Sequence, residues 1–321
     1  MKLPPVSLPI LPASFFGMVL GLIGLGSAWR AAHAVWHLPS VIGEAFMVGG
    51  SLVWAVLVCL FTGKWMWTRE LAVAEARHPV QCCFIGLAGV ATMLVAVSVE
   101  PYARLPALML FVAGAAFTIV FAVWRTGHLW RGGRDPADNT PVLYLPAVAG
   151  CFVTAIAAAT FGFANWGQLA FGAGLLSWLG IESVLIHRLY TATEMPRALR
   201  PALGIQAAPP AVAAVAYLAL TAGSPDIVAL GLVGYALFQC LLLARLGRWI
   251  FAGGVTASAW SFTFGATALA TAAVRMAGRG PDNPTAFLAP AILAIVTALV
   301  SVLTLRTAWL LRAGRLLPPA T

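Results

Sequence analysis

Residues 104–124 read RLPALMLFVAGAAFTIVFAVW, a run whose only charged side chain is Arg104 at its first position. A helix needs about 20 mostly apolar residues to cross the hydrocarbon core of a bilayer, so this run predicts one membrane-spanning helix. Nine further apolar runs lie at residues 13–32, 41–63, 80–99, 142–163, 165–187, 202–222, 226–246, 255–275 and 285–310. The sequence therefore predicts an all-α integral membrane protein with ten transmembrane helices.

The composition supports a membrane protein and excludes the main soluble classes. Hydrophobic residues make up 61% of the 321 residues and charged residues only 9%, against about 25% charged in an average soluble protein. A membrane β-barrel would alternate apolar and polar residues, whereas these runs are continuous. The net charge of +9 comes from short basic clusters between the runs, a pattern typical of membrane topology and not of nucleic-acid binding.

The basic residues are distributed unequally between the two sets of linkers. The two termini and the linkers after the even-numbered runs hold 15 of the 19 lysines and arginines. The positive-inside rule then predicts a multi-pass protein of the cell inner (plasma) membrane, with both termini on the cytoplasmic side. The remaining linkers hold the other four, which are Arg30, Arg104, Arg275 and Arg279.

The chain also contains a repeat. The first basic residue after each even-numbered run recurs with a period of about 60 residues, at Lys64, Arg125, Arg188, Arg245 and Arg306. This period predicts one transmembrane domain, residues 1–321, in which five hairpins of the same orientation surround a common axis. Their approximate bounds are 13–63, 80–124, 142–187, 202–246 and 255–310.

Odd-numbered and even-numbered runs differ in side-chain size. Odd runs are rich in small or helix-breaking residues, which permit close approach between helices, whereas the bulkier even runs suit contact with lipid. We therefore expect five inner helices around a central pore, kinked where freed carbonyls face protein or water, and five outer helices. The alternative is that these residues serve packing alone. The candidates are Gly17, Gly86, Gly89, Pro146, Gly150, Pro209 and Gly265.

Acidic residues are scarce along the odd runs. Intramembrane acids normally mark proton or cation pathways, whereas a pore for anions works without fixed charges if binding is weak enough for release. Of the acids in even runs, we interpret Glu44 as interfacial and Glu182 as a polar contact with a neighbouring helix, with a role in transport as the alternative. No nucleophile–base pair, phosphate loop or metal-ligand spacing occurs, so the sequence predicts no enzyme, cofactor or metal site.

The ninth run contains Trp260-Ser261-Phe262-Thr263-Phe264-Gly265. Residues 260 and 264 share one face of a helix. A phenylalanine among small residues is able to close a narrow passage by filling it and excluding water. The alternative is an aromatic side chain that only packs in the core.

Several stretches together resemble the tellurite-resistance/dicarboxylate transporter family, which includes the bacterial tellurite-resistance membrane protein and the plant slow-type anion channels. The order and spacing of these stretches carry the resemblance, which runs nearly end to end. They are Leu11-Pro12 with Phe16-Gly17, His78-Pro79-Val80, Tyr144-Leu145-Pro146, Phe171-Gly172-Ala173-Gly174, Ala208-Pro209 and Phe262-Thr263-Phe264-Gly265.

The resemblance implies ten helices in five hairpins and a homotrimer whose protomers each hold a pore. It implies that Phe264 occludes that pore, and it adds Phe16 and Phe262 to the pore-lining or kink candidates. It also implies small anions such as chloride and nitrate as partners. The chain departs from the family at Gly17-Met18-Val19-Leu20, near Gly86, and at Ser183, where relatives often have proline.

The leading hypothesis is a gated channel for small anions, closed by Phe264. The alternative is a secondary carrier for C4-dicarboxylate, sulfite or other oxo-anions, with a link to tellurite resistance. A third hypothesis is a membrane scaffold or sensor that transports nothing. Liposomes that contain such a protein would remain impermeable to every anion.

Overall fold

The computed structural model describes residues 11–280 and 283–316. Over these residues the protein is all-helical and contains no strand, as the sequence predicts. Nine segments of this part of the chain are long and apolar enough to cross a membrane. They are Ala13–Trp36, Ser40–Trp67, Gln81–Val99, Arg104–Leu129, Pro141–Thr160, Ala164–Thr191, Arg200–Leu220, Ile227–Ile250 and Pro284–Arg312.

The predicted span at residues 255–275 is not among these nine. It forms a 3₁₀ segment, η7 (Ala257–Phe262), followed by α10 (Thr263–Arg279). Buried threonines at 263, 267 and 271 reduce its apolar character. A helix enclosed by protein needs no apolar surface toward lipid, so it can cross a membrane without a strongly apolar sequence. A tenth crossing by this segment stays a prediction.

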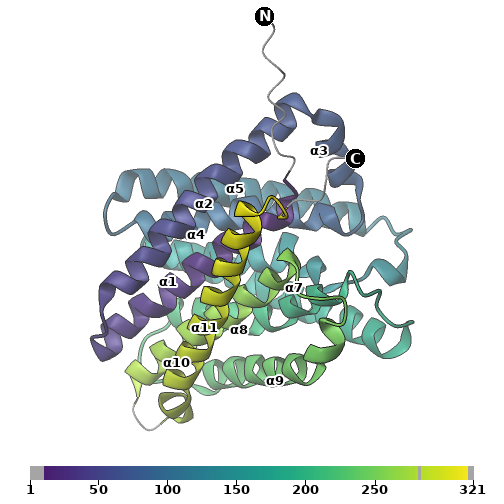
Figure 1. The fold of residues 1–321 in the computed structure, drawn as a ribbon. Coiled ribbons are helices and arrows are strands. Elements are labelled where there is room, and N and C mark those ends of the chain that lie inside the picture. The colour runs from purple at the N-terminus through teal and green to yellow at the C-terminus, as the bar shows by residue number, and fades with distance from the viewer. Residues whose placement is uncertain (1–10, 281–282, 317–321) are drawn as a thin grey trace, which may run out of the picture.

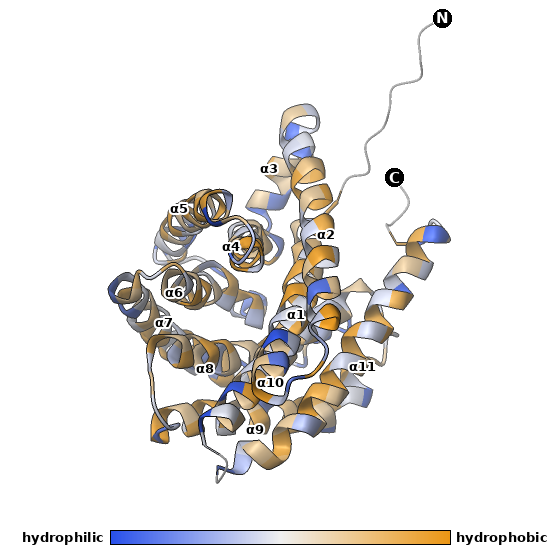
Figure 2. Cartoon of the chain, turned by 90° about the vertical axis from the view of Figure 1, so that its left-hand side faces the viewer, coloured by the Kyte–Doolittle hydropathy of each residue, from blue (hydrophilic) through white to orange (hydrophobic). Residues whose placement is uncertain are grey.

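Five helices pack side by side in a closed ring: α1 contacts α4 and α10, α6 contacts α4 and α8, and α8 contacts α10. Figure 2 shows this ring nearly end-on. We call these five helices, together with the short segments that precede them, the inner segments. The helices are α1 (Phe16–Trp36), α4 (Leu87–Val99), α6 (Gly150–Thr160), α8 (Ala208–Leu220) and α10.

Five longer helices lie outside this ring, and each packs on the inner helix next to it in the chain. Within the nine apolar segments, 72–83% of the residues are buried in the inner ones and 17–33% in the outer ones, which leaves the outer apolar faces for lipid. In Figure 1, α2 and α9 run along the edge of the molecule. The outer helices are α2 (Ser40–Trp67), α5 (Arg104–Leu129), α7 (Ala164–Thr191), α9 (Ile227–Ile250) and α11 (Pro284–Arg312), and the short α3 (Arg69–Arg77) follows α2.

Each inner helix begins with a turn that is not α-helical. Such turns carry less regular hydrogen bonding than an α-helix and often mark functional hinges. Prolines precede or begin most of them, at Pro12, Pro79, Pro141 and Pro201. The segments are η1 (Ala13–Phe15), η2 (Gln81–Gly86), η4 (Pro141–Leu143) with the π-helical η5 (Leu145–Ala149), η6 (Arg200–Ala207) and η7; η3 (Pro136–Asp138) lies in the α5–η4 linker.

Candidate functional site

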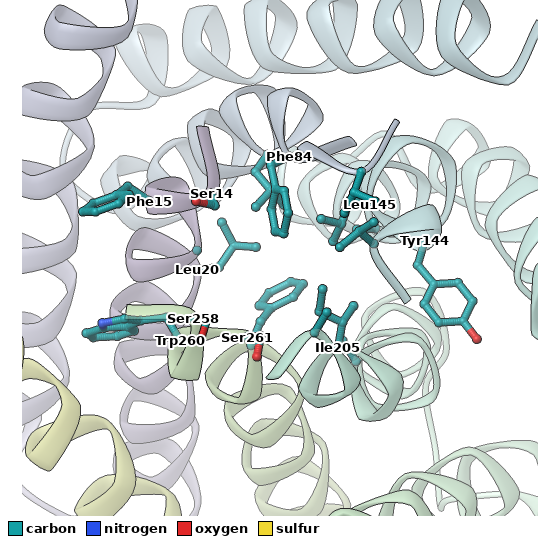
Figure 3. Close-up of a pocket in the computed structure, with 18 of the residues that line it drawn as sticks. Ser14, Phe15, Leu20, Phe84, Tyr144, Leu145, Ile205, Ser258, Trp260 and Ser261 are labelled. Atoms are coloured by element: carbon teal, nitrogen blue, oxygen red, sulfur yellow. The ribbon is translucent and has the colours of Figure 1, made fainter. Parts of the chain in front are cut away.

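A cavity of about 180 Å³ lies inside the ring, among the turns that begin the inner helices. All five inner segments contribute to its wall, so the cavity exists only because segments distant in sequence come together. Figure 3 shows side chains from each of them. Examples are Phe15, Phe84, Leu145, Ile205 and Trp260.

The wall of the cavity is apolar and uncharged. Its polar side chains are Ser14, Gln81, Tyr144, Ser258 and Ser261, and no charged residue lines it within the described chain. The Ser261 hydroxyl donates to the Pro201 carbonyl oxygen at 2.5 Å. Such a wall offers a desolvated anion a few hydroxyl and amide donors and no fixed countercharge.

The cavity ends partway along the inner helices. On each inner segment the lining residue farthest along the chain is large or aliphatic, and the cavity extends no farther than these five. Two of these five residues are aromatic: the Phe152 ring is fully buried in the core, whereas the Phe264 ring is only partly buried. The five residues are Leu20, Leu87, Phe152, Val212 and Phe264.

Three of the predicted pore residues line this cavity: Gly17, Pro209 and Phe264. A Cβ atom added to Gly17 would meet no atom within 4 Å, so this position borders open space. Phe264 is the second residue of α10 and follows the η7 turn. The structure thus brings residues from three different inner segments to one cavity.

Three of the other candidates face the outer helix α5 and do not line the cavity. A Cβ atom added to Gly86 would lie 3.1 Å from the Phe121 ring, and one added to Gly89 or Gly150 would collide with the Thr118 side chain. Their small size permits close helix packing, which is the alternative left open by the sequence. Gly86 ends η2 and Gly150 begins α6, so both also stand at changes of helix type.

The remaining four candidates also lie outside the cavity wall. Phe16 is 2% exposed and its ring packs edge-on against Phe61 at 5.7 Å. Phe262 packs against Phe251, with ring centroids 5.2 Å apart. Pro146 lies within the π-helical η5, and Gly265 lies against the backbone at the start of α8.

Sequence reasoning missed most of the wall, including Phe15, Phe84, Leu145 and Ile205. Hydrophobic residues in an apolar run carry no mark of the face they occupy, so composition does not distinguish them from core residues. The signal that was available is the proline at the start of four of the five odd runs, since the cavity lies beside the irregular turns that these prolines precede or begin.

Buried and half-buried guanidinium groups lie beside the cavity wall. Arg125 and Arg134 both donate to the carbonyl oxygen of Pro79, at 3.1 and 2.9 Å, and Pro79 precedes the lining residue Val80. Burial lowers the pKa of the Arg134 guanidinium. Arg200 stacks over the Trp249 ring, 4.3 Å from its centroid. Arg200 is also paired with Glu194 at 3.0 Å, so the positive field next to the uncharged cavity comes from Arg125 and Arg134.

Sequence comparisons agree with this architecture. The profile of a family described as voltage-dependent anion channel (SLAC1) matches residues 11–308. The chain is 33% identical to the tellurite resistance protein TehA homolog of Haemophilus influenzae over 82% of this chain and 80% of that protein.

Two plant proteins are similar over most of the chain. The guard cell S-type anion channel SLAC1 of Arabidopsis thaliana is 27% identical over 92% of this chain and 55% of its own length. The S-type anion channel SLAH3 of the same plant is 24% identical over 92% of this chain and 48% of its own length. The chain therefore spans about half the length of these plant channels.

Proposed function

The chain belongs to the voltage-dependent anion channel (SLAC1) family, and on that premise we propose that it is a gated channel for small anions such as chloride and nitrate. The observation that carries this proposal is the uncharged cavity enclosed by all five inner segments. A wall without fixed positive charge binds anions weakly, and weak binding is what rapid release requires.

The proposed gate is Phe264. Its ring lines the end of the cavity that lies farthest along the inner helices. A ring at that level would fill a narrow passage and exclude water from it, which blocks ion movement by dewetting. Opening then requires that the Phe264 ring leave the passage, either by rotation of its side chain or by a change in η7.

The proposed topology has ten crossings in five hairpins, with η7 and α10 as the ninth. Its support is that α10 packs between α1 and α8 in the ring and that α11 packs on α10. The excess of basic residues in one set of linkers favours cytoplasmic termini in a bacterial-type inner membrane. The resemblance also supports a homotrimer, which the mass of the detergent-solubilised protein would test.

Flux measurements on proteoliposomes test the channel and its gate together. Phe264→Ala should raise chloride flux at least several-fold over the parent, because the passage loses the ring that fills it. Phe262→Ala is the matched control, since Phe262 packs against Phe251 outside the cavity, and its flux should stay near that of the parent.

Equal flux through all three proteins, each correctly inserted, would reject Phe264 as the gate. The dependence of flux on anion concentration separates the two transport hypotheses. A channel gives flux that rises nearly in proportion to concentration, whereas a carrier for dicarboxylate or an oxo-anion saturates. If liposomes with the parent and liposomes with Phe264→Ala both remain impermeable to every anion, the scaffold hypothesis is favoured instead.

A further inference from the structure

An intramembrane carboxylate, Glu182, lies behind the wall of the cavity. Glu182 belongs to the outer helix α7, about two thirds of the way along it. Donors from α7 itself and from three other elements converge on its two oxygens. They are the hydroxyl groups of Tyr144 and Tyr235 (2.6 Å for Tyr235), Trp178 Nε1 at 3.0 Å, Gln206 Nε2 at 3.1 Å and Gln239 Nε2 at 3.4 Å.

This arrangement suits an ionised carboxylate. The Trp178 indole N–H and the Gln206 and Gln239 amide NH₂ groups only donate hydrogen bonds. A carboxylate accepts from all three, whereas the O–H of a neutral carboxylic acid could not donate to any of them. Among the described residues, no lysine, arginine or histidine forms an ion pair with Glu182. Glu182 therefore places one uncompensated negative charge within the bundle.

Two of the donors connect this charge to the cavity. Tyr144 lines the cavity, and its hydroxyl points away from the cavity centre, on the side where it donates to Glu182 (Figure 3). Gln206 Nε2 donates to both the Tyr144 hydroxyl and Glu182, and Gln206 follows the lining residue Ile205. The carboxylate thus lies one side chain behind the wall.

An anion in the cavity is repelled by this carboxylate in proportion to the anion's own charge. A divalent anion meets twice the Coulomb energy of a monovalent one at the same place. Counter-ions screen a charge that is surrounded by protein much less than a charge in water. The penalty for divalent anions is accordingly greater. Arg125 and Arg134, which lie behind the wall at Pro79, act in the opposite sense, so the contribution of Glu182 is the change in selectivity when its charge alone is removed.

We propose that Glu182 is a specificity-determining residue that makes the cavity favour monovalent over divalent anions. This inference rests on the proposed function, because it names the class of anion that the channel carries. It also favours chloride and nitrate over dicarboxylates. The ring of neutral donors around Glu182 holds the charge in place without cancelling it.

The test is the ratio of sulfate flux to chloride flux in proteoliposomes of the intact chain. Glu182→Gln removes the charge and should raise this ratio at least several-fold, because a divalent anion loses twice the repulsion that a monovalent anion loses. Glu182→Asp keeps the charge and should leave the ratio within about twofold of the parent. A purely structural role predicts similar ratios for both variants.

A second variant keeps the test decisive if Glu182→Gln does not fold. Gln239→Lys places an ammonium group beside Glu182 and should raise the ratio in the same direction by neutralising the charge. An unchanged ratio in every folded charge-removing variant, with normal chloride flux, would overturn the inference and leave the proposed channel intact. Absence of chloride flux in both the parent and Phe264→Ala would overturn both.

Discussion

Gly265 lies directly against Ala208: a Cβ atom added to Gly265 would be 2.8 Å from the backbone nitrogen of Ala208 and 2.9 Å from the carbonyl carbon of Ala207. Both neighbours are main-chain atoms, which cannot rotate away as a flexible side chain can. The start of α10 therefore approaches the η6–α8 junction at a distance that only glycine allows. Phe264 is the preceding residue, so this contact also sets the position of its ring.

Gly265→Ala should destabilise the protein by about 1–3 kcal/mol, the usual cost of overpacking a filled interior. Thermal unfolding in detergent measures this loss, and chloride flux should change as well because Phe264 moves with α10. Gly17→Ala is the control, since an added Cβ there meets no atom within 4 Å. Equal unfolding temperatures for the two variants would show that α10 adjusts without strain.

A buried ion pair joins α2 to α3 beside the first inner segment. Lys64 Nζ lies 2.7 Å from Glu75 Oε2, with side chains 6% and 9% exposed, and Glu75 Oε1 accepts the Ala13 N–H at 2.8 Å. Glu75→Gln leaves Lys64 without a countercharge and should cost about 3–5 kcal/mol of stability. Chemical or thermal unfolding provides the measurement.

Glu70 supplies the control for that prediction, because it lies on the same short helix and is exposed. Glu70→Gln should change stability by less than about 0.5 kcal/mol. Adding Lys64→Met to Glu75→Gln should recover much of the loss, since the unpaired buried charge is then removed. If the double variant is as unstable as Glu75→Gln alone, the unpaired Lys64 ammonium is not the source of the loss.

Ser258 lines the cavity and is exposed to solvent, so a charge placed there should act on entering anions. Ser258→Asp should lower chloride flux and Ser258→Lys should raise it, each by several-fold at low ionic strength. Both effects should shrink as salt is raised, because exposed charges are screened. Ala137→Asp, also exposed but outside the cavity wall, should change flux much less; an equal decrease would indicate a general surface-charge effect.

Asp226 caps the N-terminus of α9, and its carboxylate accepts the N–H groups of Val228 and Ala229 at 3.1 and 3.0 Å. The hydroxyl of Tyr217, followed by these amides, lowers the pKa of Asp226. A lowered pKa in the folded state means that ionised Asp226 stabilises the fold above the unfolded-state pKa, and that this contribution disappears as pH falls through the folded-state pKa.

Asp226→Asn should therefore lower the unfolding temperature most near neutral pH, and the difference from the parent should fade below about pH 4. Unfolding curves for the two proteins between neutral and acidic pH supply the measurement. A difference that stays constant across this range would mean that the charge of Asp226 contributes nothing.

The sequence by itself determined the class of fold and the family. Apolar runs such as 104–124 specify helices locally, because each backbone polar group in a bilayer must be paired within its own helix. Small residues in odd runs and bulky residues in even runs also indicated which helices are buried. The ninth run is the membrane span that the sequence predicts least strongly. Its threonines suit a helix surrounded by protein, and they lower its hydropathy.

Only the tertiary structure decided which side chains meet. Gly17 borders the cavity whereas Gly86, Gly89 and Gly150 face α5, and nothing in composition separates these glycines. The donors around Glu182 likewise come from four elements spread over nearly 100 residues. Helix formation depends on neighbours along the chain, but the face that each helix presents depends on how all five inner segments pack, and that information is not local.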